Sequence, residues 1–154
     1  MNNLKMCNFS NMSVFVLLFS LWSSGGTTLY GQKSSPVSWI FELKKINTSE
    51  YEIIATASIK KDWLLYSQFT DDTGPVPTQF VLEDEVVTFE EKSKSLKEFD
   101  PMFDVDVIKF KEMAVFSKKV HRSEKKNISG YVTYMTCDGT KCLPPADVNF
   151  NLNY

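Results

Sequence analysis

The stretch VSWIFELKKINTSEYEIIATASI, from Val37 to Ile59, decides the fold class. Apolar side chains occupy every second position on both sides of a polar triplet, Asn47-Thr48-Ser49. They are Val37, Trp39, Phe41 and Leu43 before the triplet, and Tyr51, Ile53, Ala55, Ala57 and Ile59 after it. A period of two places these side chains on one face of a strand, and Asn, Thr and Ser favour turns. The stretch therefore predicts a β-hairpin with one buried face.

The same period continues towards the C-terminus in shorter runs. These runs are Trp63–Phe69, Phe80–Leu82, Val86–Phe89, a run resuming at Val105, Ala114–Val120, Ile128–Thr136 and a last alternation at Val148–Tyr154. Turn residues such as Gly74 and Pro75 punctuate the chain, and the mostly polar segment Lys92–Asp100 favours a long loop. Roughly seven to nine short strands without a helical period predict an all-β, antiparallel immunoglobulin-like β-sandwich.

Length and charge narrow the classes of function. The chain has 154 residues, 43% of them hydrophobic, which suits one globular domain. Its net charge is -2 with the charges interspersed, so we expect no nucleic-acid partner. His121 is the one histidine and follows two lysines, a setting that favours a solvated strand end over a general base or a metal site.

The N-terminal segment has the composition of a signal peptide. Lys5 supplies a positive charge ahead of the apolar run Val14–Trp22, which is too short for a membrane span of about 20 residues. We expect cleavage after Gly31, giving a signal peptide over residues 1–31 and an exported domain over residues 32–154 with no membrane span. Cys7 leaves with the peptide, so the mature chain keeps two cysteines.

Those two cysteines, Cys137 and Cys142, flank a turn of sequence Asp-Gly-Thr-Lys. Asp-Gly between strand-like runs is typical of a hairpin, so the two sulfurs can face each other across a tight loop. A disulfide closing a loop of six residues stabilises a fold by only about 2 kcal/mol in the chain-entropy account. The residues alone leave open whether the pair is redox-active or structural.

The charges beside the two thiols differ in sign. Lys141 adjoins Cys142 and favours its thiolate, whereas Asp138 adjoins Cys137 and disfavours a second negative charge. Cys142 is therefore the candidate nucleophile.

Two segments carry a resemblance to a known family. They are Gly130–Pro145, GYVTYMTCDGTKCLPP, and the upstream block WLLYSQ at Trp63–Gln68 followed by GPVPT at Gly74–Thr78. The chain resembles the N-terminal periplasmic domain of the bacterial thiol:disulfide interchange protein DsbD, in its stand-alone form. The resemblance extends over nearly the whole mature chain and is loose between Glu83 and Asp100.

The resemblance implies a role for the cysteine pair in the periplasm, without a cofactor. The pair would accept electrons from a thioredoxin-like donor and pass them to disulfides of exported proteins, as one component of protein-disulfide reduction. Cys142 would form the mixed disulfide and Cys137 would resolve it. A cap loop would shield the pair, with Phe103 as the cap candidate and Phe99 as the weaker one. The 154 residues hold neither the membrane-embedded conductor nor the thioredoxin-like domain of full-length DsbD, so we expect one step of a relay.

Two alternatives stay open. One is a non-enzymatic immunoglobulin-like binding module whose disulfide tightens a hairpin. The other is a Cu(I) site formed by Met135, Cys137 and Cys142, because soft sulfur ligands suit that ion.

Overall fold

The computed structural model describes residues 35–122 and 127–154, so the expected signal peptide, residues 1–31, lies outside the described residues. The described residues form β-strands and turns, without a helix. The strands are β1 (Val37–Lys45), β2 (Glu50–Ile59), β3 (Leu64–Tyr66), β4 (Gln79–Leu82), β5 (Glu85–Val87), β6 (Glu90–Glu91), β7 (Leu96–Asp100), β8 (Val105–Phe110), β9 (Met113–His121), β10 (Ile128–Cys137) and β11 (Cys142–Leu152).

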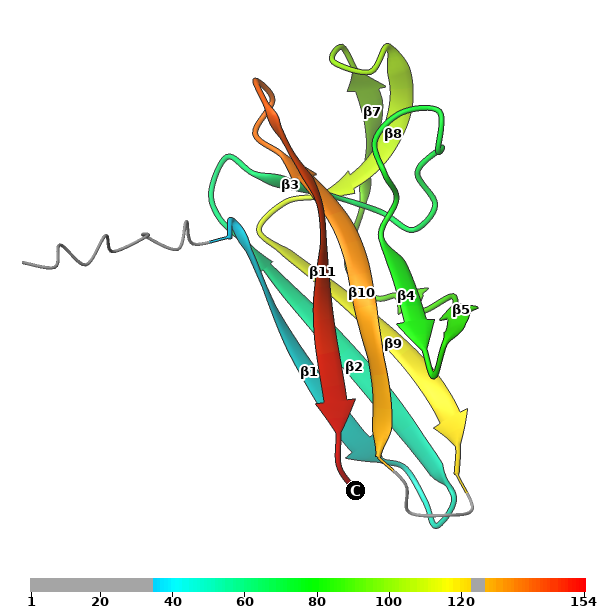
Figure 1. Cartoon of the computed structure of the whole chain (residues 1–154). Helices are drawn as coiled ribbons and strands as arrows, with labels where there is room; N and C mark the ends of the chain where they lie inside the picture. The colour runs from blue at the N-terminus through cyan, green and yellow to red at the C-terminus, as the bar shows by residue number, and fades with distance from the viewer. Residues whose placement is uncertain (1–34, 123–126) are drawn as a thin grey trace, which may run out of the picture. The chain divides into compact units, whose positions relative to one another are not determined.

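The strands make two antiparallel sheets, one behind the other in Figure 1. The first has the order β1-β2-β9-β6, and the second has the order β5-β4-β10-β3-β8-β7. Strand β11 pairs with β10 on the side that β3 and β4 leave free. The chain is therefore an all-β antiparallel sandwich of the immunoglobulin-like kind, as the period of two predicts.

The hairpin expected at Val37–Ile59 is present, with β1 and β2 paired in register from Val37–Ile59 to Lys45–Tyr51. All five alternating apolar residues of β2 are buried. They join Trp39 of β1 and aromatic side chains of the second sheet in the main core. Phe80 and Phe89 stack with ring centroids 4.1 Å apart, and Trp39 lies 5.7 Å from Phe116. Burial of this apolar surface is the main driving force for the sandwich.

The described residues form eleven strands, more than the expected seven to nine, and two local expectations were also wrong. The run Trp63–Phe69 is a strand only over Leu64–Tyr66, because Ser67 turns the chain and donates its hydroxyl to the Glu91 carboxylate at 2.8 Å. The second half of the expected loop Lys92–Asp100 is strand β7, whose Glu98 forms an ion pair with the buried Lys109 of β8 at 2.8 Å. A strand held by polar partners carries no apolar alternation, so its sequence resembles a loop.

Strand β11 contains two prolines directly after its first residues, Pro144 and Pro145. Proline cannot donate a backbone hydrogen bond, and β11 has β10 as its one strand partner in the described sheets, so it tolerates both. The register between β10 and β11 shifts between Tyr134 and Thr136, just before the cysteines. Within residues 35–122 and 127–154, no helix is long and apolar enough to cross a membrane.

Candidate functional site: a half-buried disulfide at the end of a hairpin

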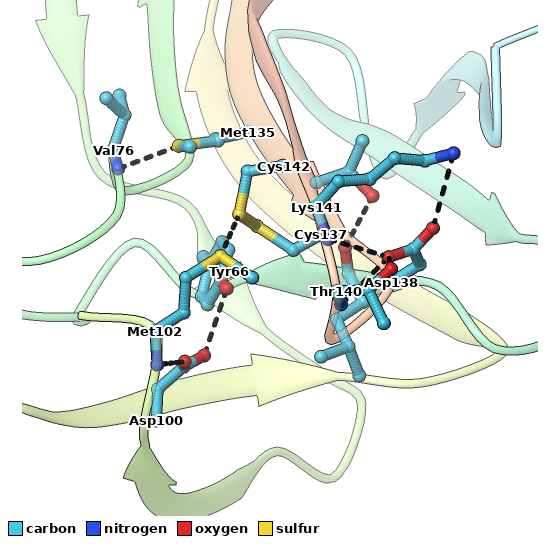
Figure 2. Close-up of a disulfide and its surroundings, with 12 residues drawn as sticks. Tyr66, Val76, Asp100, Met102, Met135, Cys137, Asp138, Thr140, Lys141 and Cys142 are labelled. Atoms are coloured by element: carbon cyan, nitrogen blue, oxygen red, sulfur yellow. Dashed lines mark hydrogen bonds and ion pairs between the residues drawn. A yellow bond between two sulfur atoms is a disulfide. The ribbon is translucent and has the colours of Figure 1, made fainter. Parts of the chain in front are cut away.

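Cys137 and Cys142 form a disulfide at the end of the β10–β11 hairpin, as Figure 2 shows. Cys137 is the last residue of β10 and Cys142 is the first residue of β11. The two are direct partners in the strand register, and their Cα atoms lie 4.1 Å apart. Strand pairing therefore brings the two sulfurs together independently of the bond between them.

The turn between the cysteines is organised by the carboxylate of Asp138. Its Oδ1 accepts hydrogen bonds from the Thr140 hydroxyl at 2.7 Å, the Thr140 amide at 3.0 Å and the Lys141 amide at 2.9 Å. Gly139 has a φ of +83°, a conformation that favours glycine. The bonds to Thr140, and then that to the Lys141 amide, hold the pKa of Asp138 at about 2, below its usual 3.8.

The two sulfurs differ in burial. Cys137 is 1% exposed and packs in a small cluster with Tyr66 of β3 and Val107 of β8. Cys142 is only partly buried and lies at the margin of the same cluster. Cys142 is therefore the more solvent-accessible of the two cysteine residues.

The charge argument for Cys142 has weaker support in the structure than in the sequence. The Lys141 ammonium lies 3.7 Å from Asp138 Oδ2 and 5.8 Å from the ring centroid of Trp63. In Figure 2 the Lys141 side chain extends towards Asp138 and away from the Cys142 sulfur. Burial, more than charge, distinguishes the two cysteines.

A short loop between β7 and β8, residues 101–104, lies against the disulfide. Met102 places its Sδ 3.2 Å from the Cys142 Sγ, and its side chain stays 42% exposed. Neither sulfur carries a proton while the disulfide is closed, so this is a packing contact between polarisable atoms. The sequence interpretation missed Met102, although its position beside Phe103 in the expected cap loop could have indicated it.

The two cap candidates occupy different places. Phe103 packs against the cluster that contains Cys137, and its ring meets Tyr66 edge-on with centroids 6.2 Å apart. Phe99 lies on β7, is 56% exposed and is not part of that cluster. The structure thus brings Phe103 to the site and leaves Phe99 outside it, while the capping role of Phe103 stays a prediction.

The buried carboxylate of Asp100 holds the β7–β8 loop through hydrogen bonds. Asp100 is buried, and its carboxylate accepts hydrogen bonds from the Tyr66 hydroxyl at 3.2 Å and from the Met102 amide at 3.0 Å. The buried Lys109 ammonium lies 3.8 Å from the same carboxylate and 2.8 Å from Glu98. Burial first, and then the negative charge of Asp100, raise the pKa of Tyr66 above its usual 10, so its phenol stays a donor.

The backbone carbonyl of Asp100 also holds the β7–β8 loop. It accepts hydrogen bonds from the amides of Phe103 at 3.2 Å and Asp104 at 2.9 Å, which close the loop into a tight turn. Asp104 ends that turn with a φ of +59°. The position of Met102 over the disulfide is therefore fixed by both the side chain and the backbone of Asp100.

Residues 74–76 also pack near the disulfide. A Cβ on Gly74 would lie 2.7 Å from the Val105 side chain, so the glycine permits close packing beside residues 101–104. Two residues on, the Val76 amide donates to the Sδ of Met135 on β10 at 3.4 Å. The two segments singled out in the sequence, Trp63–Thr78 and Gly130–Pro145, therefore meet at the disulfide.

Comparison with solved structures finds proteins with a similar fold. No family model matches the chain, and no curated protein matches it in sequence. A solved structure, the N-terminal periplasmic domain of ScsB from Proteus mirabilis, matches with a TM-score of 0.62 at 16% identity over 77% of this chain. The chain has the fold of the part of this ScsB structure that it matches. It spans 47% of the solved ScsB chain, about half of its length.

A second solved structure is the N-terminal domain of Neisseria meningitidis DsbD in the reduced form. It matches with a TM-score of 0.48 at 16% identity, over 75% of this chain and 85% of that one.

Proposed function

We propose that the chain is an exported thiol/disulfide exchange module that passes electrons from a thioredoxin-like donor to disulfides of exported proteins through Cys137 and Cys142. The observation that carries the proposal is the unequal burial of the two cysteine residues, since Cys137 is buried and Cys142 is only partly buried. A disulfide that only stabilises a hairpin does not require one cysteine to be more accessible than the other. A fold shared with a periplasmic domain and the signal-peptide composition of residues 1–31 support export.

The unequal burial of the two cysteines supports one order of steps for the exchange. A donor thiolate attacks the Cys142 Sγ, the bond to Cys137 breaks, and Cys137 leaves as a thiolate within the buried cluster. The second donor thiol then attacks the donor's own sulfur in the mixed disulfide and releases Cys142. In the second half of the cycle, the Cys142 thiolate attacks a substrate disulfide and forms a mixed disulfide. Cys137, its direct partner in the strand register, then attacks Cys142, which releases the reduced substrate and closes the disulfide again.

The short span of the disulfide also supports exchange over bracing. A loop of six residues contributes about 2 kcal/mol by chain entropy, and the antiparallel pairing of β10 with β11 already holds the two ends together. Breaking the bond therefore leaves a hairpin whose strands stay paired, ready to form the bond again.

Trapping tests the proposal directly. The full chain carrying Cys137→Ser is exported in a bacterial host, and its mixed disulfides are analysed on non-reducing gels and by mass spectrometry. We expect adducts at Cys142 with exported thioredoxin-like proteins, and far fewer adducts with the matched variant Cys142→Ser.

Other results would contradict the proposal or the assigned roles of the two cysteines. Adducts with Cys142→Ser instead would reverse the roles of the cysteines, and adducts with neither variant would remove the exchange function. A reduction potential below about -300 mV would mark the bond as a resistant structural disulfide. Unchanged partner binding after replacement of both cysteines would then favour the binding module.

A further inference from the structure

We propose that the reduced form of the site binds one Cu(I) ion through Cys137, Cys142 and the thioether of Met102. The sulfurs come from three parts of the chain, the end of β10, the start of β11 and the β7–β8 loop, and Figure 2 shows them at one place. Thiolate and thioether sulfurs are soft ligands, and soft ligands select Cu(I) over divalent ions that prefer oxygen.

The distances suit a shared ion. Met102 Sδ lies 3.2 Å from Cys142 Sγ, and the Cα atoms of the two cysteines lie 4.1 Å apart. Metal–sulfur bonds are about 2.3 Å long in zinc thiolates, so Met102 Sδ and Cys142 Sγ can reach the same ion. The short Cα–Cα distance of the cysteines lets the Cys137 thiolate reach that ion too once the disulfide is open. Met102 is 42% exposed, which leaves the ion a path from solvent.

The oxygen ligands nearby are already engaged. Asp138 is held by Thr140 and Lys141, and Asp100 is held by Tyr66, the Met102 amide and Lys109. A divalent ion that prefers oxygen would have to displace these partners, whereas Cu(I) would not.

Met102 replaces Met135 as the expected thioether ligand. Met135 packs against the same cluster, but its Sδ accepts the Val76 amide hydrogen at 3.4 Å. The Met102 sulfur has the Cys142 sulfur as its neighbour, and the backbone bond of Met102 to Asp100 holds it there. The tertiary structure thus changes the ligand set that the sequence suggests.

Binding requires that the disulfide first accept two electrons, from a dithiol donor in the proposed exchange or from a phosphine reductant in vitro. The two thiols then lose their protons to solvent as the thiolates bind Cu(I), and the ion keeps its oxidation state. The inference shares with the proposed function only the condition that the pair can be reduced. An ion bound to both thiolates would block exchange, since neither sulfur could then attack a disulfide.

The experiment titrates the exported chain, reduced with a phosphine and kept without oxygen, with Cu(I) against the chelator bicinchoninate. We expect one Cu(I) per reduced chain and none on the oxidised chain. Met102→Leu should weaken the affinity by on the order of ten-fold or more. Met113→Leu is the matched control, because Met113 is 52% exposed on β9, and its affinity should equal that of the wild type. X-ray absorption should find three sulfur neighbours in the wild type and two in Met102→Leu.

Equal affinities for the wild type and Met102→Leu, or two sulfur neighbours in both, would overturn the assignment of Met102. A reduced chain with two titratable thiols that binds no Cu(I) would overturn the site altogether. The trapping experiment adds no copper and its Cys137→Ser variant lacks one of the proposed ligands, so failure of the metal site and failure of the exchange function are separate outcomes.

Discussion

At the scale of single residues, Asp138 sets the shape of the turn between the cysteines. Its pKa of about 2 lies below the usual 3.8 because Thr140 and Lys141 donate hydrogen bonds to the charged form. A lowered pKa means that the folded state favours the carboxylate. The stabilisation is therefore complete above pH 3.8 and is lost as the pH falls through about 2.

Thr140→Val tests this account, because it removes the hydroxyl donor and leaves the backbone donors in place. We expect the Asp138 titration midpoint, measured by NMR of the side-chain carboxyl carbon, to move from about 2 towards 3.8. An unmoved midpoint would show that the Thr140 hydroxyl is not the main cause.

Gly130 of β10 lies where the neighbouring strands β4 and β11 leave no room for a side chain. A Cβ there would overlap the Val81 carbonyl of β4 and lie 2.7 Å from the Phe150 ring of β11. Gly130→Ala should lower the free energy of unfolding by about 2 kcal/mol or more, because the Val81 carbonyl can make room for the added methyl group only if the backbone of β4 shifts. Urea unfolding measures the change, with the exposed neighbour Ser129→Ala as control. Equal stability of Gly130→Ala and wild type would contradict the close packing.

At the scale of elements, strands β7 and β8 and their connecting loop form a hairpin beside the disulfide, and a buried carboxylate holds the loop. Asp100 joins Tyr66 below the loop to the Met102 amide within it, and Lys109 balances its charge. The loop carries two of the side chains that pack at the site, Met102 and Phe103. We therefore predict that the stability of this hairpin and the accessibility of Cys142 are coupled.

Asp100→Asn removes the charge beside Lys109 and should cost about 2 kcal/mol in the free energy of unfolding. It should also speed reduction of the disulfide by glutathione, because a loosened loop uncovers Cys142. Asp106→Asn, at an exposed position on β8, is the matched control and should change neither quantity. A destabilised Asp100→Asn chain that is reduced at the wild-type rate would separate the loop from access to the sulfur.

At the scale of the whole molecule, the sandwich should keep its fold without the disulfide. The main core lies between the two sheets, whereas Cys137 belongs to a separate small cluster with Tyr66 and Val107. Reduction should therefore lower the free energy of unfolding by no more than about 2 kcal/mol. Urea unfolding with and without a phosphine reductant measures this, with circular dichroism to follow the strands. Unfolding on reduction would make the bond structural.

The sequence by itself determined the fold class, because alternation of apolar and polar residues is a local property of strands. It identified the β1–β2 hairpin, the buried face of β2 and the pairing of Cys137 with Cys142 across a tight turn. It missed β7, since that strand is held by ion pairs and hydrogen bonds, which leave no period in the sequence.

Only the tertiary structure decided what surrounds the disulfide. The contact of Met102 with Cys142 joins residues 40 positions apart, and that of Asp100 with Tyr66 joins residues 34 positions apart. The sequence distinguished the two sulfurs by neighbouring charges, whereas the structure distinguishes them by burial, and the charge of Lys141 is directed to Asp138. Burial depends on segments distant in the chain, so no local pattern could reveal which sulfur faces solvent.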